Sequence, residues 1–424
     1  MATGKRVLIV GAGPTGLIAA LGLARQGVQV TVIDKAPEVS RWPRAMVYLS
    51  STLKVLDELG LLAAAHDVAA TGYEYNIRFG LTGTIGRLNF RDVEDLTPYA
   101  YNLHFGQDVL AEIVLKEFLK LPGAQVRWNV AFENVVKNDS SVVVSVVTAE
   151  GPSILEADWL IAADGARSSV RKNLGIDFEG FTWDDVFMAT NVIYDFDKHG
   201  YAPSTMLAHA DDWAVIAKID NHHQWRIAYG EAASLSEDER LARIPERIKQ
   251  FLPDPLQPFE LLMANAYSVH QRSAATYRLG RILLAGDAAH ATNPIGGLGF
   301  TSGIQDADQL IKCLGGCING VFSVDALDWY AYERRRCFLE IANPTAIEFK
   351  RRTQEKNPVK RLQDEENFLA LMGNREQRRR AMTSIFSLAG RDYCPEWREL
   401  YLKADESGAS PNLGAHGGIM ISEE

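Results

Sequence analysis

The chain has 424 residues, 47% of them hydrophobic and 23% charged, and its formal net charge at pH 7 is −10. This length favours two or three domains, and the acidic balance argues against a nucleic-acid-binding surface. The basic run at residues 378–380 stands among glutamates, so we interpret it as one solvated helix face.

Membrane insertion and metal binding are not expected. No stretch approaches the roughly 20 apolar residues that a membrane-spanning helix needs. The apolar segment at residues 6–10 is too short for a signal peptide and runs straight into a glycine-rich turn. Of the four cysteines, Cys313 and Cys317 have helical i, i+4 spacing, but no further His or Cys lies near them in the sequence. We therefore expect no metal site and a cytoplasmic protein.

The first motif lies in a predicted strand–helix–strand unit. Residues 5–10 predict a buried strand, residues 14–26 a helix and residues 28–34 a second strand. A glycine-rich turn joins the first strand to the helix, and an acidic and a basic residue follow about 20 positions on. This arrangement is typical of dinucleotide binding. The candidate residues are Gly11, Gly13, Pro14, Thr15, Gly16, Asp34 and Lys35. Taken alone, the motif leaves open whether the nucleotide is NAD or FAD.

A second motif follows a longer segment of mixed elements. The pattern predicts helices near residues 50–60 and 108–120, and strands near residues 125–130, 141–148 and 156–163. The sequence at 162–171 then contains Asp164 and Gly165 directly after an apolar strand. This segment is either a cofactor loop or an ordinary turn in which Ser168 or Ser169 caps a helix.

The middle of the chain predicts an antiparallel sheet. We expect a hairpin that joins residues 213–219 to 224–230, and a polar helix at about 235–251. The order of elements indicates an α/β fold in which a Rossmann-type domain is interrupted by a mostly antiparallel sheet domain. The expected cofactor domain comprises residues 1–72, 104–180 and 275–345, and the substrate domain comprises 73–103 and 181–274. We expect a helical segment at 346–404 and a flexible tail at 405–424.

The third motif is a strand that ends at Gly286 and Asp287 and runs into a glycine-rich loop. We expect a helix to begin at about Thr301, so that its N-terminal N–H groups face an electron-rich ring or an anion. Two glycine-rich helix starts in one chain suit a long cofactor.

The three motifs, in this order and spacing, resemble those of the group A flavoprotein monooxygenases, the para-hydroxybenzoate hydroxylase-like family. The resemblance implies a glutathione reductase-like FAD-binding domain, with NADH or NADPH as a transient reductant. Asp34 would then bind the adenosine ribose, and Asp287 the ribityl chain. It also adds Arg44 and Gln107, and it places Pro294, Gly297, Gly299, Phe300 and Thr301 around the isoalloxazine ring.

The resemblance further implies the reaction. One oxygen atom from O2 would be inserted into an aromatic, phenol-like small molecule through a flavin C4a-hydroperoxide. Pro294, Arg226 and Tyr229 are the candidate catalytic residues, although the last two also suit ordinary sheet surface or packing. Alternation along the hairpin predicts Lys218 and Arg226 on one face, with Trp225 and Tyr229 on the other.

Several alternatives stay open at this stage. An FAD-dependent reductase, a Baeyer–Villiger or epoxidising oxygenase, or an idle flavin-bound binding protein would use the same scaffold. The sequence does not choose between NADH and NADPH and does not identify the substrate. The C-terminal thioredoxin-like domain of many relatives is not expected here, and a homodimer is possible.

Overall fold

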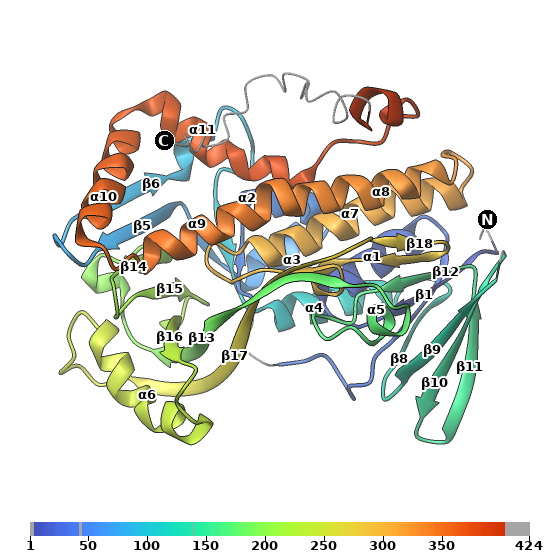
Figure 1. The fold of residues 1–424 in the computed structure, drawn as a ribbon, viewed down its shortest axis with the longest axis horizontal. Coiled ribbons are helices and arrows are strands. Elements are labelled where there is room, and N and C mark those ends of the chain that lie inside the picture. The colour runs from blue at the N-terminus through green and yellow to red at the C-terminus, as the bar shows by residue number, and fades with distance from the viewer. Residues whose placement is uncertain (1–3, 42–44, 139, 403–424) are drawn as a thin grey trace.

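A six-stranded sheet forms the centre of one half of the molecule (Figure 1). The computed structural model describes residues 4–41, 45–138 and 140–402. The strand order is β18-β19-β12-β1-β2-β8, and all neighbours pair in parallel except β18 and β19. The strands are β1 (Arg6–Val10), β2 (Gln29–Ile33), β8 (Ala124–Arg127), β12 (Trp159–Ala162), β18 (Arg278–Leu279) and β19 (Ile282–Leu284).

Helices bury the strands of this sheet, as parallel sheets require. All four residues of β12 are buried, and α1 packs between α4 and α7. This layer places the amino ends of α1 and α7 near the strand ends. The helices of this half are α1 (Pro14–Arg25), α2 (Ser50–Glu58), α3 (Leu62–Val68), α4 (Gln107–Phe118), α5 (Ser169–Asn173), α7 (Leu298–Ile318) and α8 (Asp325–Cys337).

An eight-stranded, mostly antiparallel sheet forms the second half, in the order β20-β17-β13-β16-β15-β14-β5-β6. Its two longest strands, β13 and β17, extend from this sheet back toward the first half (Figure 1). The strands are β5 (Glu74–Phe79), β6 (Ile85–Asn89), β13 (Phe178–Ile193), β14 (Ser204–Ala208), β15 (Ala214–Lys218), β16 (Gln224–Ala232), β17 (Glu260–Ala274) and β20 (His290–Ala291).

Helix α6 (Glu237–Phe251) covers one face of the eight-stranded sheet. Its first turn is fixed by a capping box, in which Ser236 and Glu239 satisfy each other's backbone N–H groups. Ile248 and Phe251 of α6 pack against Trp225 and Tyr229 of β16. The opposite face of the sheet is therefore the one available to a cofactor and a substrate.

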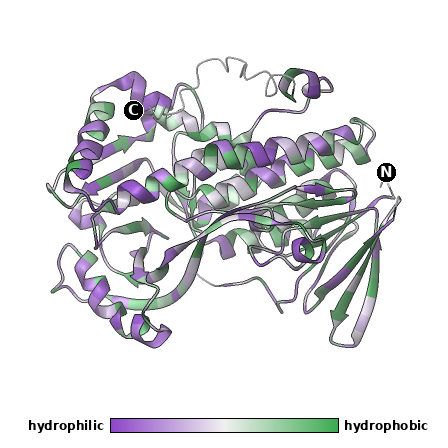
Figure 2. Cartoon of the chain, in the orientation of Figure 1, coloured by the Kyte–Doolittle hydropathy of each residue, from purple (hydrophilic) through white to green (hydrophobic). Residues whose placement is uncertain are grey.

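Two small sheets and the C-terminal helices complete the fold. Figure 2 shows that α10 and α11 are mostly hydrophilic, in contrast to the central strands. The small sheets comprise β3 (Val47–Tyr48), β7 (Asn102–His104) and β4 (Ala70–Gly72), and β11 (Gly151–Ala157), β10 (Val142–Thr148) and β9 (Ala131–Lys137). The C-terminal helices are α9 (Asn343–Thr353), α10 (Pro358–Gly373) and α11 (Arg375–Thr383). The short helical turns are η1 (Phe90–Val93), η2 (Asp197–His199), η3 (Gly286–Ala288), η4 (Phe338–Ala342), η5 (Ser384–Ala389) and η6 (Arg398–Leu402).

The predicted fold class is confirmed, and so is the hairpin, because β15 and β16 pair antiparallel. The proposed domain boundaries stay a prediction, and the expected tail at 405–424 lies outside the described residues. Among the helices that the structure describes, none is long and apolar enough to cross a bilayer.

Two details differ from expectation. Lys218 lies directly opposite Trp225 and shares its face, whereas Arg226 faces Ala217. Alternation holds within one strand, but the face of a residue on the next strand depends on the register that the turn sets. Part of the basic run is also packed rather than solvated, because Arg378 and Arg379 pair with acidic residues at 92 and 95.

Candidate active site

The glycine turn between β1 and α1 has the geometry that a phosphate group needs. Gly11 has a φ of +110°, and a Cβ atom there would overlap the carbonyl group of Ala163. Gly16 lies just as tightly against the carbonyl oxygen of Gly11. No heavy atom lies within 4 Å of a Cβ placed on Gly13, so its backbone borders open space. Pro14 begins α1, whose first N–H groups point toward that space.

Asp34 lies beside this turn at the end of β2. Its carboxylate accepts hydrogen bonds from the backbone N–H groups of Ala12 at 2.8 Å and Ala36 at 2.9 Å. These bonds fix the carboxylate next to the phosphate-binding turn, where a ribose would follow. Lys35 is exposed, and Arg44 lies outside the described residues. Gln107 is the first residue of α4, and its N–H donates to the Ala45 carbonyl at 3.1 Å.

The Asp164 carboxylate supports the amino end of α5. Its carboxylate accepts from the Ser168 hydroxyl at 2.5 Å and from the Ser169 N–H at 2.7 Å. Burial raises the pKa of Asp164, and these hydrogen bonds oppose the rise. Gly165 has a φ of +82° and open space beside it. The capping alternative is therefore realised by Ser168, while contact of this loop with FAD stays a prediction.

Arg171 connects two of the three motifs, and sequence reasoning did not assign it a role. Its guanidinium donates to the carbonyls of Ala166 at 2.8 Å and Ala288 at 2.7 Å. Arg171 is buried and lies over the ring of Phe178. The signal in the sequence is a basic residue at the end of the second motif, and this signal does not reveal burial.

The loop at Gly286 and Asp287 meets α1 and α7. Gly286 has a φ of +59°, and its Cβ would lie 2.8 Å from the Thr15 hydroxyl oxygen. The Gly286 N–H donates to Asp306 Oδ2 at 2.9 Å, and Asp306 Oδ1 accepts from buried Arg334 at 2.7 Å. Asp287 is exposed, so its carboxylate is accessible to a ligand.

His290 completes the group around Asp306. Its Nε2 lies 2.7 Å from Asp306 Oδ2, and its ring stacks on Phe338 at 4.7 Å between centroids. Burial raises the pKa of Asp306, but the charges of His290 and Arg334 outweigh burial and hold that pKa below its usual value. His290 thus has a structural position behind the Gly286 loop.

The glycine-rich loop before α7 is held at its base and exposed at its tip. Asn293 is fully buried and donates to the Ala346 carbonyl at 2.9 Å. Pro294 is exposed, and its carbonyl accepts from the Gly297 N–H at 3.0 Å. Gly299 lies in the first turn of α7 and would crowd Thr292 if it carried a Cβ.

Helix α7 begins three residues before the expected Thr301. Gly297 has a φ of +71° and serves as the N-cap, so the helix starts at Leu298. The Thr301 N–H already donates to the Gly297 carbonyl at 3.2 Å. The N–H groups left without a helical acceptor are therefore those of Leu298, Gly299 and Phe300.

An aromatic group lies beside this helix start. The Phe300 ring meets Tyr48 edge-on at 5.2 Å between centroids, and Tyr48 stacks on Phe105 at 4.0 Å. The open glycine turn, the exposed Asp287 and the free N–H groups of α7 together fit a long, flat nucleotide cofactor. In this arrangement Gly13 and Asp34 would hold the diphosphate and ribose, and α7 would face the ring.

Arg226 lies on the sheet face that points away from α6. Its Nε donates to Asn191 Oδ1 at 3.0 Å, and both side chains are buried. Phe187 shares this face and packs against Ile295 of the glycine-rich loop. The loop and Arg226 therefore border the same side of the sheet.

Tyr229 lies on the other face. It is fully buried, and its ring packs against Phe251 of α6 at 5.1 Å between centroids. Its hydroxyl group has no hydrogen-bond partner among the described residues. Tyr229 thus faces α6, on the opposite side of the sheet from Arg226, and its expected catalytic role stays a prediction.

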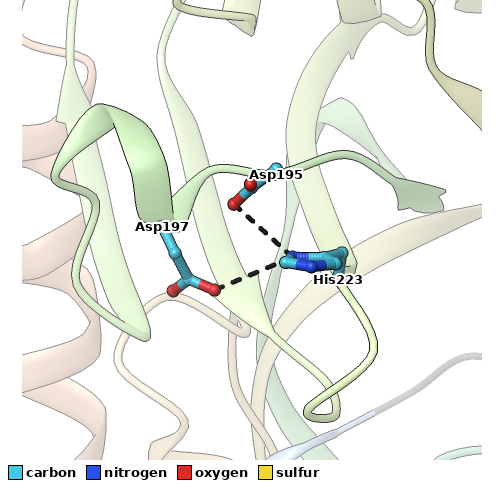
Figure 3. A group of neighbouring side chains, drawn as sticks. All are labelled: Asp195, Asp197 and His223. Atoms are coloured by element: carbon cyan, nitrogen blue, oxygen red, sulfur yellow. Dashed lines mark ion pairs between the residues drawn. The ribbon is translucent and has the colours of Figure 1, made fainter.

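A separate charged group lies near the hairpin (Figure 3). His223 Nδ1 lies 3.4 Å from Asp195 and 3.9 Å from Asp197. Lys218 Nζ is already 2.7 Å from the Asp197 carboxylate. We interpret this group as a surface ion-pair cluster.

The chain matches the sequence profile of a family described as "FAD binding domain" over residues 5–343. Para-nitrophenol 4-monooxygenase of Pseudomonas sp. (strain WBC-3) is 39% identical over 393 residues, which cover 92% of this chain and 98% of that protein. The protein is a group A flavoprotein monooxygenase.

Two further comparisons agree with this membership. The 6-hydroxy-3-succinoylpyridine 3-monooxygenase of Pseudomonas putida (strain DSM 28022 / S16) is 38% identical to this chain over 365 residues. The match covers 84% of this chain and 91% of that protein. The crystal structure of p-nitrophenol 4-monooxygenase from Pseudomonas putida DLL-E4 superimposes with a TM-score of 0.89 at 37% identity, covering 93% of this chain and 100% of that one. The monooxygenase is FAD-dependent, consumes NAD(P)H and acts on aromatic compounds.

Proposed function

We propose that the monooxygenase oxygenates a phenol at the ring carbon opposite the hydroxyl group, and that Arg226 binds the phenolate oxygen. One observation carries this proposal. Arg226 is a buried cation on the sheet face that borders the glycine-rich loop, and no carboxylate of a described residue forms an ion pair with it. A guanidinium in this setting favours an anionic oxygen as its partner.

The names of two relatives support the position of attack. In para-nitrophenol, ring position 4 lies opposite the hydroxyl group and carries the nitro group. In 6-hydroxy-3-succinoylpyridine, position 3 lies opposite the hydroxyl group and carries the succinoyl chain. We infer that this monooxygenase also accepts a ring whose attacked carbon already bears a substituent, which then leaves.

Four features would contribute to such a reaction. Bound FAD, once reduced, supplies an electrophilic oxygen derived from O2. Arg226 binds the ionised hydroxyl group, which makes the opposite carbon electron-rich. With FAD bound, the N–H groups at the start of α7 would stabilise negative charge on the reduced flavin ring. Pro294, exposed at the tip of the loop, would border the reacting atoms.

For 4-nitrophenol the atoms balance as follows. One phenol, one NAD(P)H and one O2 give one benzoquinone, one nitrite, one NAD(P)+ and one water. The new C–O bond forms at the nitro-bearing carbon. The nitro group leaves as nitrite with the electron pair of the C–N bond, and the new hydroxyl group loses its proton to become the second quinone carbonyl.

The test is an assay of the FAD-loaded protein with 4-nitrophenol and with 3-nitrophenol as the matched control. We expect 4-nitrophenol to release one nitrite per NAD(P)H consumed. The control carries hydrogen at the attacked carbon, so it should release none. Absence of 4-nitrophenol-dependent nitrite would contradict the proposed position of attack. The Arg226→Met variant should lose about 10- to 100-fold in kcat/KM, because a hydrogen bond to a charged group is worth about 1.5 to 3 kcal/mol.

We also propose that the protein works in the cytoplasm as a homodimer. All four cysteines are free, which suits a reducing compartment. Val359, Leu362 and Leu369 of α10 are exposed and apolar, which suits a contact between copies. Light scattering of the purified protein tests the second point, and a monomer at micromolar concentration would refute it.

A further inference from the structure

Arg226 has an amide as its partner where a carboxylate would be the usual choice. Asn191 on β13 and Arg226 on β16 are directly opposite in the antiparallel register. Both are buried, with 7% and 9% of their surface exposed, and the Nε–H group donates to Asn191 Oδ1 at 3.0 Å. Asn191 therefore fixes the plane of the guanidinium without neutralising it.

Two other buried arginines are neutralised by carboxylates, and a third, Arg171, donates both terminal nitrogens to backbone carbonyls. Arg334 lies 2.7 Å from the Asp306 carboxylate. Arg247, on the α6 side of the sheet, lies 3.4 Å from Glu231 and 2.6 Å from Asp212. Leaving a buried cation without acceptors at its terminal nitrogens costs several kcal/mol, so Arg226, which donates only through Nε, calls for a partner that arrives with the ligand.

The groups that surround Arg226 do not supply that partner. Burial lowers the pKa of Arg226 to about 10, and the opposing effects of Tyr267 of β17 and Asp108 of α4 on that pKa do not outweigh burial. Burial raises the pKa of Tyr267 to about 12, so this phenol is neutral at pH 7. Among the described residues, neither terminal nitrogen of Arg226 makes a hydrogen bond. Both remain free to form a fork toward a ligand.

We propose that Asn191 is a positioning residue that leaves the charge of Arg226 uncompensated, so that a bound phenol ionises and loses its proton to solvent. This inference rests on the proposed function, because it assumes a phenol as the ligand. An aspartate at position 191 would hold the guanidinium in the same plane but would cancel the charge that the phenolate oxygen meets. Asparagine is thus the residue that combines orientation with an available charge.

The experiment is a pH titration of 4-nitrophenol bound to the FAD-loaded protein in the absence of NAD(P)H, followed by the visible band of the phenolate. An opposite charge at contact distance lowers a pKa by about 1 to 3 units. We expect a shift of this size for the bound phenol in the native protein. The Asn191→Asp variant should lose most of the shift, and its KM at a pH below the pKa of the free phenol should rise about 10-fold or more.

Two variants separate charge from structure. Asn191→Ala removes the hydrogen bond but adds no charge, so it should retain the shift while KM rises. Asn367→Asp adds the same charge on the exposed surface of α10 and should change neither quantity. A merely structural role would make the Ala and Asp variants alike in both readouts.

The outcomes distinguish the two proposals. If the native protein binds 4-nitrophenol and releases nitrite, but the Asn191→Asp variant keeps the full pKa shift of the bound phenol, the role of Asn191 is overturned and the proposed function stands. Binding of the phenol in its neutral form to the native protein would overturn the role of Asn191 as well. Failure of native protein to bind 4-nitrophenol or to release nitrite would overturn the proposed function, and the inference with it.

Discussion

Asp306→Asn tests whether the buried acid behind the Gly286 loop holds the cofactor site in place. Asp306 is fully buried, and its two oxygens accept hydrogen bonds from Gly286, His290 and Arg334. An asparagine has one accepting oxygen in place of two. If that oxygen faces Arg334, the amide NH2 group faces the Gly286 N–H and leaves that donor without an acceptor.

The size of the effect follows from burial. Arg334 is 1% exposed, so loss of the carboxylate charge leaves a buried cation without its counter-ion. Breaking a buried ion pair in this way costs about 3 to 5 kcal/mol of unfolding free energy. The matched control is Asp308→Asn on the same helix, because Asp308 pairs with Lys312, whose side chain is 41% exposed. We expect the control to lose at most about 1 kcal/mol.

The assay is urea unfolding of both variants, followed by circular dichroism, together with FAD affinity from the quenching of flavin fluorescence. Asp306→Asn should unfold at a lower urea concentration than Asp308→Asn and bind FAD more weakly, since the Gly286 N–H no longer has its anchor. Equal unfolding midpoints and equal FAD affinities for the two variants would refute this account of the loop.

Three further predictions use other parts of the structure. The Gly286→Ala variant should lose FAD on purification, because Gly286 has a φ of +59° and an added Cβ would lie 2.8 Å from the Thr15 hydroxyl oxygen. The control variant Gly373→Ala should retain FAD, because Gly373 has open space around it. Equal flavin content in the two variants would contradict this prediction. Tyr229→Phe should keep kcat within about twofold and unfold at the same or a higher temperature, since it removes a buried hydroxyl group without a partner; a tenfold loss of kcat would return Tyr229 to the catalytic site. Burial would raise the pKa of Glu333, but hydrogen bonds from Arg336 and Arg391 outweigh burial and lower this pKa from 4.5 to about 2. The Glu333→Gln variant should therefore lose about 3 kcal/mol of unfolding free energy above pH 4.5. The difference in unfolding free energy between the variant and the native protein should shrink as the pH falls from 4.5 toward 2, and a difference that does not depend on pH would rule out this ion pair as its source.

The sequence by itself determined the cofactor scaffold. The turn from Gly11 to Gly16, Asp34 after the second strand, and the segment from Gly286 into a helix are local patterns, in which spacing along the chain dictates the geometry. A turn that needs a glycine with positive φ, and the amino end of a helix, both depend mainly on residues that are close together in the sequence. These patterns also resemble those of the group A flavoprotein monooxygenases, and that resemblance implied the FAD dependence and the class of reaction.

Only the tertiary structure decided which side chains share a face with the glycine-rich loop. Tyr229 and Arg226 are three residues apart on one strand, yet α6 covers the first and the glycine-rich loop borders the face of the second. Lys218 fell on the unexpected face because the register of the hairpin is set by its turn. The pairing of β13 with β16 places Asn191 opposite Arg226, and the alternation of residues within either strand does not predict that contact.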